Sequence, residues 1–173
     1  DEVLEVMNKY FQDEYGNPGS FHTIGLRPKR AMAKARELVR DIINAKVKNR
    51  EIFRPFAPVI LEEYTDKYFE SDKNLPISAR YMLMVYPFKE IGYKQVPAVV
   101  HVDGSGRLQT LAKKDNPKYY SLIEGYEKLT KVPIIINTSF NVRGEPIVCN
   151  PKDAVNCFLH TDIDYLVIDQ LIC

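Results

Sequence analysis

The second half of the chain alternates short apolar runs with helix-like segments, and this alternation constrains the fold more than any other feature. Two of these segments begin with Asn-Pro, at Asn116 and Asn150, and a proline that directly follows an asparagine cap is a strong start signal for a helix. Between them, residues 132–136 (VPIII) predict a short strand, buried on both faces as in a mostly parallel sheet. Residues 164–169 (DYLVID) predict a closing strand. The pattern predicts an α/β protein.

The first half of the chain predicts mainly helices. Apolar residues at helical spacing indicate helices over 1–15 and 28–44, and a shorter one over 61–69. Residues 96–102 (VPAVVHV) then predict a strand, and the glycines of 103–106 (DGSG) predict a tight turn that leads into RLQTL as the hairpin partner. Pro55 and Pro58 are expected to force extended structure before the helix over 61–69, and strands and helices are expected to alternate from residue 96 onwards.

The bulk composition is that of an ordinary globular domain. The chain has 173 residues, enough for one domain with a substantial core. Its net charge of +1 argues against nucleic acid as a partner, and no apolar run is long enough to span a membrane. The cysteines Cys149, Cys157 and Cys173 fit no zinc spacing, so we expect reduced thiols in a cytoplasmic protein. We expect Cys149 and Cys157 to be small buried hydrophobic residues.

Basic residues gather in the segment 46–54 (KVKNREIFR). Residues two apart on an extended segment share a face, so Lys48, Arg50 and Arg54 could converge on one anion. A solvated basic edge is the alternative. The spacing leaves both interpretations open.

A second basic site follows the DGSG turn. Arg107 begins the strand there, and its guanidinium could clamp a phosphate or carboxylate with two parallel hydrogen bonds. The alternative is a simple hairpin in which Asp103 and Arg107 pair across the turn. The Gly-Lys-Ser/Thr ending of a Walker loop is absent, so this is no standard nucleotide loop.

The polar stretch 136–148 (INTSFNVRGEPIV) follows the apolar run VPIII directly. Loops that leave buried strands often carry the chemistry of α/β proteins. Arg143 offers a cation here, unless it pairs with Glu145. The other groups available for a ligand are Asn137, Ser139, Asn141 and Gly144. Together with the two basic segments, this loop predicts a site for a small phosphate-like anion.

Residues 41–172 resemble the carboxy-terminal, YrdC-like domain of the ATP-dependent O-carbamoyltransferases, the nodulation and antibiotic-tailoring family. In chain order, the matching motifs are NAKVKNREIFRPFAPVILEE, VPAVVHVDGSGRLQT, NPKYYSLIEGYEKLT, VPIIINTSFNVRGEPIVCNPKDAVNCF and TDIDYLVI. The resemblance implies an open twisted mixed sheet with flanking helices. It also implies that carbamoyl phosphate and ATP are substrates, and that carbamoyl-adenylate forms in this domain. An actin-like ATPase-type N-terminal domain, missing from this chain and holding the metal ion, then transfers the carbamoyl group to a substrate hydroxyl.

The resemblance also assigns site residues. Catalytic contacts with the phosphate and carbamoyl groups are implied for Lys48, Arg54, Arg107 and Arg143. Asn137 and Ser139 are implied as substrate-binding neighbours in the same pocket. From their places in the basic segment and the polar loop, Arg50 and Gly144 are expected to bind substrate as well. The expected partners are therefore small-molecule substrates and the N-terminal domain, with no metal in this domain, no membrane, and an oligomer left open.

The front of the chain resembles another family. Residues 1–40 contain YGNPGSFHTIG and AMAKAREL, which are similar to an early segment of the cysteine desulfurases, enzymes that use pyridoxal phosphate. The chain has no HK pair of the kind that supplies their Schiff-base lysine, so pyridoxal phosphate is not expected. This interpretation predicts a chimera, with N-terminal helices of different origin over 1–40 and the carbamoyltransferase domain over 41–173. The alternative function is a catalytically inactive chimeric or scaffold protein that folds without a complete active site.

Overall fold

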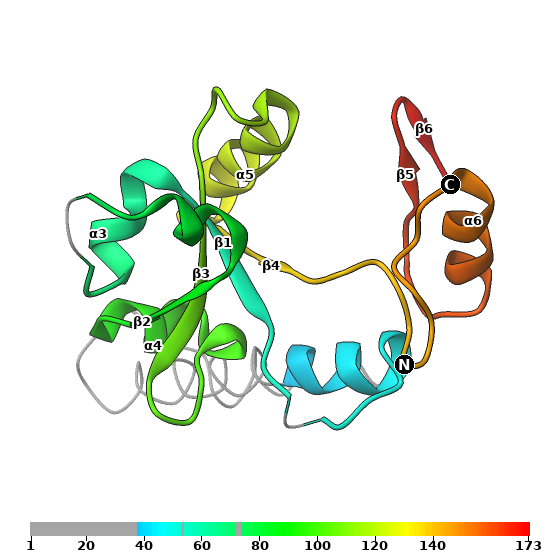
Figure 1. Ribbon diagram of the computed structural model, residues 1–173, viewed down its shortest axis with the longest axis horizontal. Helices are drawn as coiled ribbons and strands as arrows, with labels where there is room; N and C mark the ends of the chain where they lie inside the picture. Colours follow the sequence, from blue (N-terminus) through cyan, green and yellow to red (C-terminus); the bar gives the residue numbers. More distant parts are fainter. Residues whose placement is uncertain (1–37, 53, 72–73) are drawn as a thin grey trace, which may run out of the picture.

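A four-stranded mixed sheet with helices around it forms the larger part of the molecule (Figure 1). The computed structural model describes residues 38–52, 54–71 and 74–173, so the predicted helix 1–15 and most of the helix 28–44 lie outside the described residues. The strands of this sheet are β1 (Ala57–Leu61), β2 (Met84–Pro87), β3 (Ser105–Leu111) and β4 (Ile134–Asn137). Their order is β2-β3-β1-β4, with β1 parallel to β3, and with β2 antiparallel to β3 and β4 antiparallel to β1. The predicted α/β class with a mixed sheet is confirmed.

The core lies on both faces of β1, whose five residues are all buried. Because successive strand residues point to opposite faces, Ile60 joins one apolar cluster, whereas Val59 and Leu61 join another. The first cluster includes Phe69, Phe88, Leu108 and Ile134. The second includes Leu111 of β3 and the fully buried Ile123.

Most of the helices lie around the four-stranded sheet, and α6 (Pro151–Leu159) lies apart from it (Figure 1). The α-helices are α3 (Thr65–Tyr68), α4 (Glu90–Gln95), α5 (Pro117–Thr130) and α6 (Pro151–Leu159). Short helical turns are η1 (Ile43–Val47), η2 (Glu62–Tyr64), η3 (Ile77–Tyr81) and η4 (Pro97–Val99). Both Asn-Pro predictions are confirmed: the Asn116 side chain accepts a hydrogen bond from the backbone N–H of Tyr119, and that of Asn150 from the backbone N–H of Asp153. The helix predicted over 61–69 is η2 followed by α3.

Two strand predictions need correction. Residues 96–102 form no strand, because Pro97 starts the turn η4, in which Ala98 and Val99 are buried. The antiparallel partner of β3 is instead β2, with Val85 opposite Arg107. The run 132–136 does contain a strand, β4, but it lies at the edge of the sheet, antiparallel to β1, and is only half-buried beyond Ile134. An apolar run indicates burial and leaves the direction and partner of a strand undetermined.

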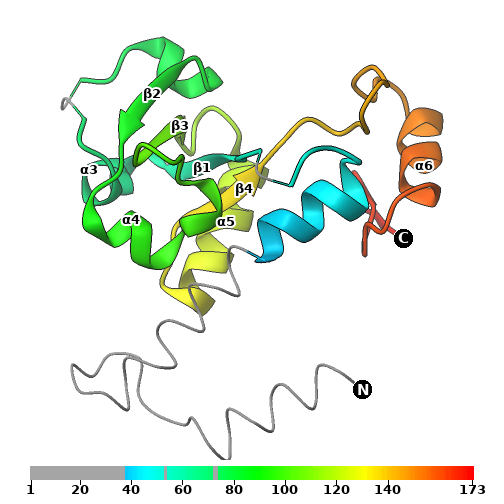
Figure 2. The same cartoon turned by 90° about the horizontal axis from the view of Figure 1, so that it is seen from below.

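The C-terminal part extends away from the sheet. After β4 an extended segment leads to α6 and to the hairpin of β5 (Val167–Ile168) and β6 (Leu171–Ile172), which Figures 1 and 2 show apart from the four-stranded sheet. The predicted closing strand 164–169 is therefore the first strand of this small hairpin. An exposed ion pair, Lys118 to Asp169 at 3.0 Å, joins the hairpin turn to α5. No helix in the described part of the chain has the length and apolar character needed to cross a membrane.

The cysteine prediction is half right. Cys157 is buried on α6, as expected for a small hydrophobic residue. Cys149 is exposed, and its thiol lies 3.3 Å from a carboxylate oxygen of Asp153. This position just before the cap of α6 faces solvent because the loop after β4 runs along the surface.

Candidate anion-binding site

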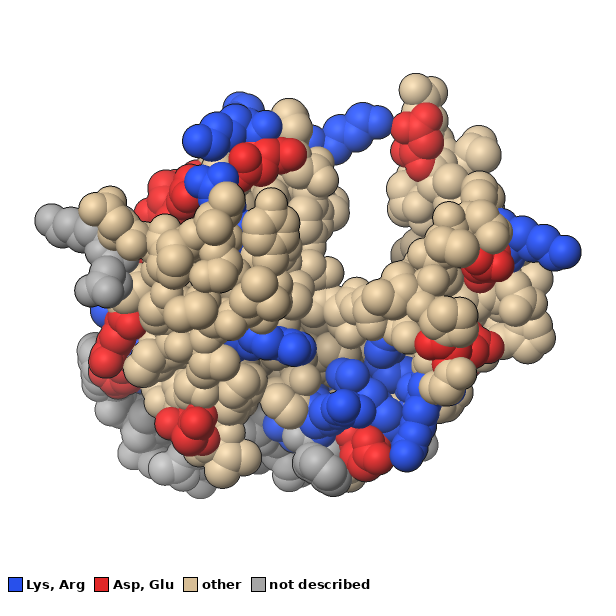
Figure 3. Space-filling model, viewed as in Figure 1, with Lys and Arg blue, Asp and Glu red and all other residues tan. Residues whose placement is uncertain are grey.

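A polar pocket of about 240 Å³ lies between the segment after η1 and the loop after β4. We call it the basic pocket; it is lined by Lys48, Arg50, Arg54, Ser139, Asn141, Val142, Arg143 and Gly144. Figure 3 shows basic side chains gathered at this place, over the loop that follows the first helix in Figure 1, with an acidic group among them. Its lining therefore combines a fixed excess of positive charge with neutral polar groups.

Lys48 is the buried centre of this arrangement, with only 4% of its surface exposed. Its Nζ donates to the backbone oxygens of Ser139 at 2.7 Å and Asn141 at 2.6 Å, and to Oδ1 of Asn141 at 3.0 Å. Burial lowers the pKa of Lys48, the charge of Arg50 lowers it further, and the Cys157 thiol opposes both. An ammonium group has three N–H donors, so these contacts use all of them to hold the loop.

The loop after β4 is held by its own polar groups as well. The Asn141 amide accepts from the Ser139 hydroxyl at 2.6 Å and donates to the backbone oxygen of Glu145 at 2.9 Å. The backbone N–H of Arg143 donates to the backbone oxygen of Lys48 at 3.1 Å. Gly144 has a φ of 85°, a conformation that favours glycine. The loop is thus shaped before any ligand arrives.

Asn44 is a site residue that the sequence did not reveal. It lies in the π-helical turn η1 and has no exposed surface. Its Nδ2 donates to the backbone oxygens of Ile52 at 3.1 Å and Arg54 at 2.7 Å, while its Oδ1 accepts from Nε of Arg50 at 2.6 Å. The signal that could have found it is an asparagine at the end of an apolar helix, directly before the basic segment.

Glu51 is an acidic residue that pairs with two arginines of the basic pocket. Its carboxylate lies 3.1 Å from Arg143 and 3.9 Å from Arg54. A hydrogen bond to its own backbone N–H lowers the pKa of Glu51, and the charge of Arg143 lowers it further. In the described residues the ion pair of Arg143 is thus with Glu51, and the alternative pairing with Glu145 is wrong.

Two predicted site residues lie outside the lining of the basic pocket. Arg107 is exposed on β3 and makes no ion pair within the described residues, while Asp103 accepts from the backbone N–H and hydroxyl of Ser105, so the Asp103–Arg107 alternative is wrong. Asn137 donates to Gln109 across the sheet at 2.7 Å. The structure thus brings together six of the eight predicted residues. Their contacts with a substrate stay predictions.

The arginines of the pocket repel one another. Burial lowers the pKa of Arg50, and the charges of Arg54 and then Arg107 lower it further. Clustered guanidinium groups with hydroxyl and amide neighbours are suited to an oxyanion such as phosphate. The volume is below the roughly 300–1,000 Å³ typical of sites for drug-sized ligands, which favours a small anion. No three His, Cys, Asp or Glu side chains cluster as metal ligands in the ranges that the structure describes.

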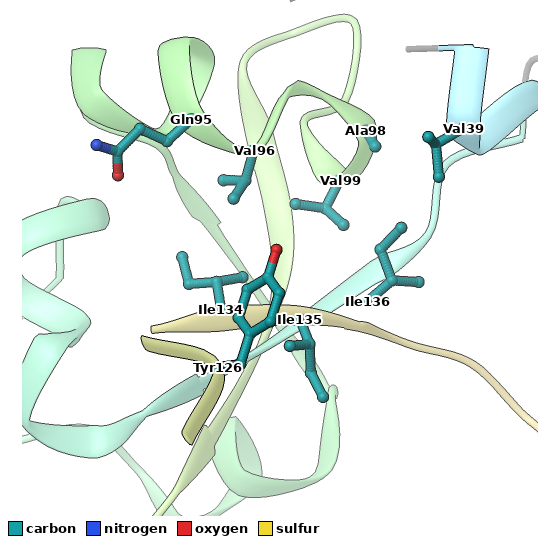
Figure 4. A pocket seen from close by; sticks show the side chains of 9 residues that line it. All are labelled: Val39, Gln95, Val96, Ala98, Val99, Tyr126, Ile134, Ile135 and Ile136. Atoms are coloured by element: carbon teal, nitrogen blue, oxygen red, sulfur yellow. The ribbon is translucent and has the colours of Figure 1, made fainter. Parts of the chain in front are cut away.

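A second cavity, which we call the apolar pocket, has a volume of about 350 Å³ and a different lining. Figure 4 shows its side chains converging from the helical residues 38–42, from α4 and η4, from α5 and from β4. Its lining residues are Val39, Gln95, Val96, Ala98, Val99, Tyr126, Ile134, Ile135 and Ile136. The Gln95 side chain accepts a hydrogen bond from the buried Tyr68 hydroxyl, and burial raises the pKa of that phenol to about 12. The lining that the described residues supply contains no charged group.

Comparison with known proteins identifies relatives of much greater length. An uncharacterized protein of Synechocystis is 42% identical over 154 residues, which cover 78% of this chain and 24% of the relative. Nodulation protein NolO of Bradyrhizobium diazoefficiens is 46% identical over 132 residues, covering 75% of this chain and 23% of that protein. Nodulation protein U of Azorhizobium caulinodans is 40% identical over 121 residues, which cover 70% of this chain and 20% of that protein. The chain spans about a quarter of the length of these relatives, or less.

A family model described as "Carbamoyltransferase C-terminus" matches residues 25–173. This match includes residues 25–40, which we expected to belong to a cysteine-desulfurase-like segment. None of these comparisons supports that assignment or a chimeric origin. With most of the chain matched by the model, and with the basic pocket inside the matched region, the chain belongs to the carbamoyltransferase C-terminal family.

Proposed function

We propose that this domain binds carbamoyl phosphate and ATP and forms carbamoyl-adenylate in two steps. Water first cleaves carbamoyl phosphate to carbamate and inorganic phosphate, and a carbamate oxygen then attacks the α-phosphorus of ATP and displaces pyrophosphate. The observation that carries the proposal is the basic pocket, in which Arg50, Arg54 and Arg143 line one small cavity. Bringing a carbamate to a phosphate crowds anionic oxygens together. Cations that are already in position stabilise the charge that develops there.

The pocket residues divide into two roles in this proposal. The three arginines bind anionic oxygens, and Arg107, whose charge acts on Arg50, adds a further positive charge to the site. Lys48 holds the backbone of the loop after β4, so that Ser139 and Gly144 line the cavity at a fixed distance from the arginines. Asn137, bound to Gln109, supports the start of the same loop.

The remaining steps belong to the longer protein of which this family is one part. We propose that an actin-like ATPase-type N-terminal domain holds the metal ion and transfers the carbamoyl group from the adenylate to a substrate hydroxyl, with release of AMP. Pyridoxal phosphate has no role in this scheme. A cytoplasmic location fits the three cysteines, all of which are free thiols.

Isothermal titration of the 173-residue chain with carbamoyl phosphate tests the site. We expect Arg143→Ala to weaken binding about tenfold, since it removes a charge-assisted contact from an exposed part of the pocket. Tyr126→Phe, in the apolar pocket, serves as the matched control and should bind like the wild type. Equal affinities of the wild type, Arg143→Ala and Arg54→Ala for carbamoyl phosphate would rule out the assigned pocket.

A second assay separates catalysis from binding. We expect ATP–pyrophosphate exchange that depends on carbamoyl phosphate, because adenylate formation releases pyrophosphate reversibly. Tight binding of carbamoyl phosphate and ATP without any exchange would favour the inactive scaffold instead. That result would support the assigned binding pocket and contradict the proposed formation of carbamoyl-adenylate.

A further inference from the structure

We propose that Asn44 is a positioning residue of the basic pocket: together with Phe56, it fixes Arg50 so that only the two terminal amino groups of the guanidinium face the anion. The inference rests on the proposed anion site and adds to it the residue that orients one of its cations. Neither Asn44 nor Phe56 lines the pocket, so both act through Arg50.

The Asn44 amide has one possible orientation. Both of its N–H groups face backbone oxygens, those of Ile52 and Arg54, and its oxygen faces the Nε–H donor of Arg50. Rotating the amide by 180° would set oxygen against two oxygens and N–H against N–H. Asn44 is fully buried, so water cannot replace a lost partner at low cost. The oxygen is therefore held towards Arg50.

The Arg50 guanidinium is restrained on two sides. Its Nε–H donates a hydrogen bond to Oδ1 of Asn44 at 2.6 Å. Its carbon Cζ lies 4.7 Å from the centre of the Phe56 ring, in a cation–π contact. Phe56 is itself buried and part of the core. Within the described residues no hydrogen-bond acceptor contacts Nη1 or Nη2. The terminal amino groups Nη1 and Nη2 are therefore available to a ligand. Their two parallel N–H donors match the spacing of two oxygens of a phosphate or carboxylate.

The same amide also fixes Arg50 relative to Arg54. Asn44 binds the backbone oxygen of Arg54, and its own backbone oxygen accepts from the N–H of Arg50 at 3.0 Å. The charges of Arg54 and Arg107 both act on Arg50, so without a restraint these cations would move apart. Asn44 therefore counters the repulsion between these clustered cations.

A double-mutant cycle tests whether Asn44 acts through Arg50, with inorganic phosphate as the probe. We expect Asn44→Ala to weaken phosphate binding at least fivefold in the wild-type background and less than twofold in the Arg50→Ala background, since the arginine it orients is then gone. Thr110→Ala, which also truncates a buried polar side chain, is the matched control and should leave phosphate affinity unchanged. Equal losses from Asn44→Ala in both backgrounds, or no loss in either, would overturn the proposal.

A measurement on the unmutated chain covers the case in which Asn44→Ala does not fold. The Nε–H proton of Arg50, assigned by its absence in Arg50→Lys, should exchange slowly with water even without phosphate, because Asn44 holds it. Fast exchange in a wild-type chain that binds phosphate would overturn the role of Asn44 alone. A wild-type chain that binds neither phosphate nor carbamoyl phosphate would instead overturn the anion site, whatever the exchange rate.

Discussion

The basic pocket and the apolar pocket are built in opposite ways, although each lies beside β4. The apolar pocket is lined by core-type residues of helices and strands, such as Val99 and Ile134, which also belong to the main apolar cluster. The basic pocket is lined by two loops, and hydrogen bonds from Lys48 and Asn44 hold those loops in place. The first depends on packing that stabilises the whole domain, whereas the second depends on a few directed polar contacts.

This difference implies that stability and ligand affinity can be changed separately. A truncation in the apolar pocket removes dispersion and burial from the core. A substitution at the exposed rim of the basic pocket removes charge and leaves the core unchanged. The following predictions test this separation, beginning with the largest effect.

Ile134→Ala should lower the free energy of unfolding by about 2–4 kcal/mol, because it removes a buried side chain from the core. Ile134 is 3% exposed and lines the apolar pocket. Urea denaturation measures the loss, and phosphate titration of the folded variant should give the wild-type affinity within a factor of two. A tenfold loss of phosphate affinity in folded Ile134→Ala would show that the two pockets are coupled through β4.

Gly144→Ala and Gly125→Ala should change stability in opposite directions. Neither glycine has an atom within 4 Å of an added Cβ, so the backbone decides the outcome. Gly144, in the basic pocket, has a φ of 85°, and we expect a loss of about 1–2 kcal/mol on substitution. Gly125, inside α5 beside Tyr126, should yield a gain of about 0.5–1 kcal/mol. Thermal denaturation of both variants checks the signs; a stabilised Gly144→Ala would contradict the conformation of this loop.

Glu51→Gln should strengthen phosphate binding about two- to fivefold, the smallest of these effects, since exposed ion pairs contribute about 0.2–1 kcal/mol. The substitution releases Arg143 and Arg54 from the carboxylate they share. Titration at low and high salt measures the gain, which should shrink as salt rises. Glu63→Gln makes the same charge change beside Tyr120 on another part of the surface and should have no effect. Weaker binding by Glu51→Gln would mean that the carboxylate orders the pocket.

Local signals predicted the starts of α5 and α6 correctly. Asn116 and Asn150 cap α5 and α6 as their Asn-Pro sequences indicate, because capping involves only residues within one turn. The partners of the strands were not predictable in this way. Val96 to Val100 would suit a strand, but the buried residues of this run enter the core from a turn, and the place beside β3 is taken by β2. Pairing depends on contacts between distant parts of the chain, which periodicity does not contain.

In the candidate site too, features of a single segment were predictable from the sequence, whereas contacts between separate segments were not. Six predicted residues do line one pocket, since the resemblance marked both loops. Asn44 was missed because its partners are backbone oxygens eight and ten residues further along, and any asparagine near a helix end looks the same in sequence. The ion pair of Arg143 with Glu51 was missed for a related reason, since the nearer Glu145 is the obvious partner in the sequence.

The contacts of Lys48 have a consequence for the order in which the protein folds. They join residues that are 91 and 93 positions apart, so they can form only after the strands between them have come together. Closing so long a stretch of chain is entropically costly and slow compared with forming a single helix. The basic pocket is therefore expected to be among the last parts to become native, and recovery of phosphate binding during refolding would report completion of the whole domain.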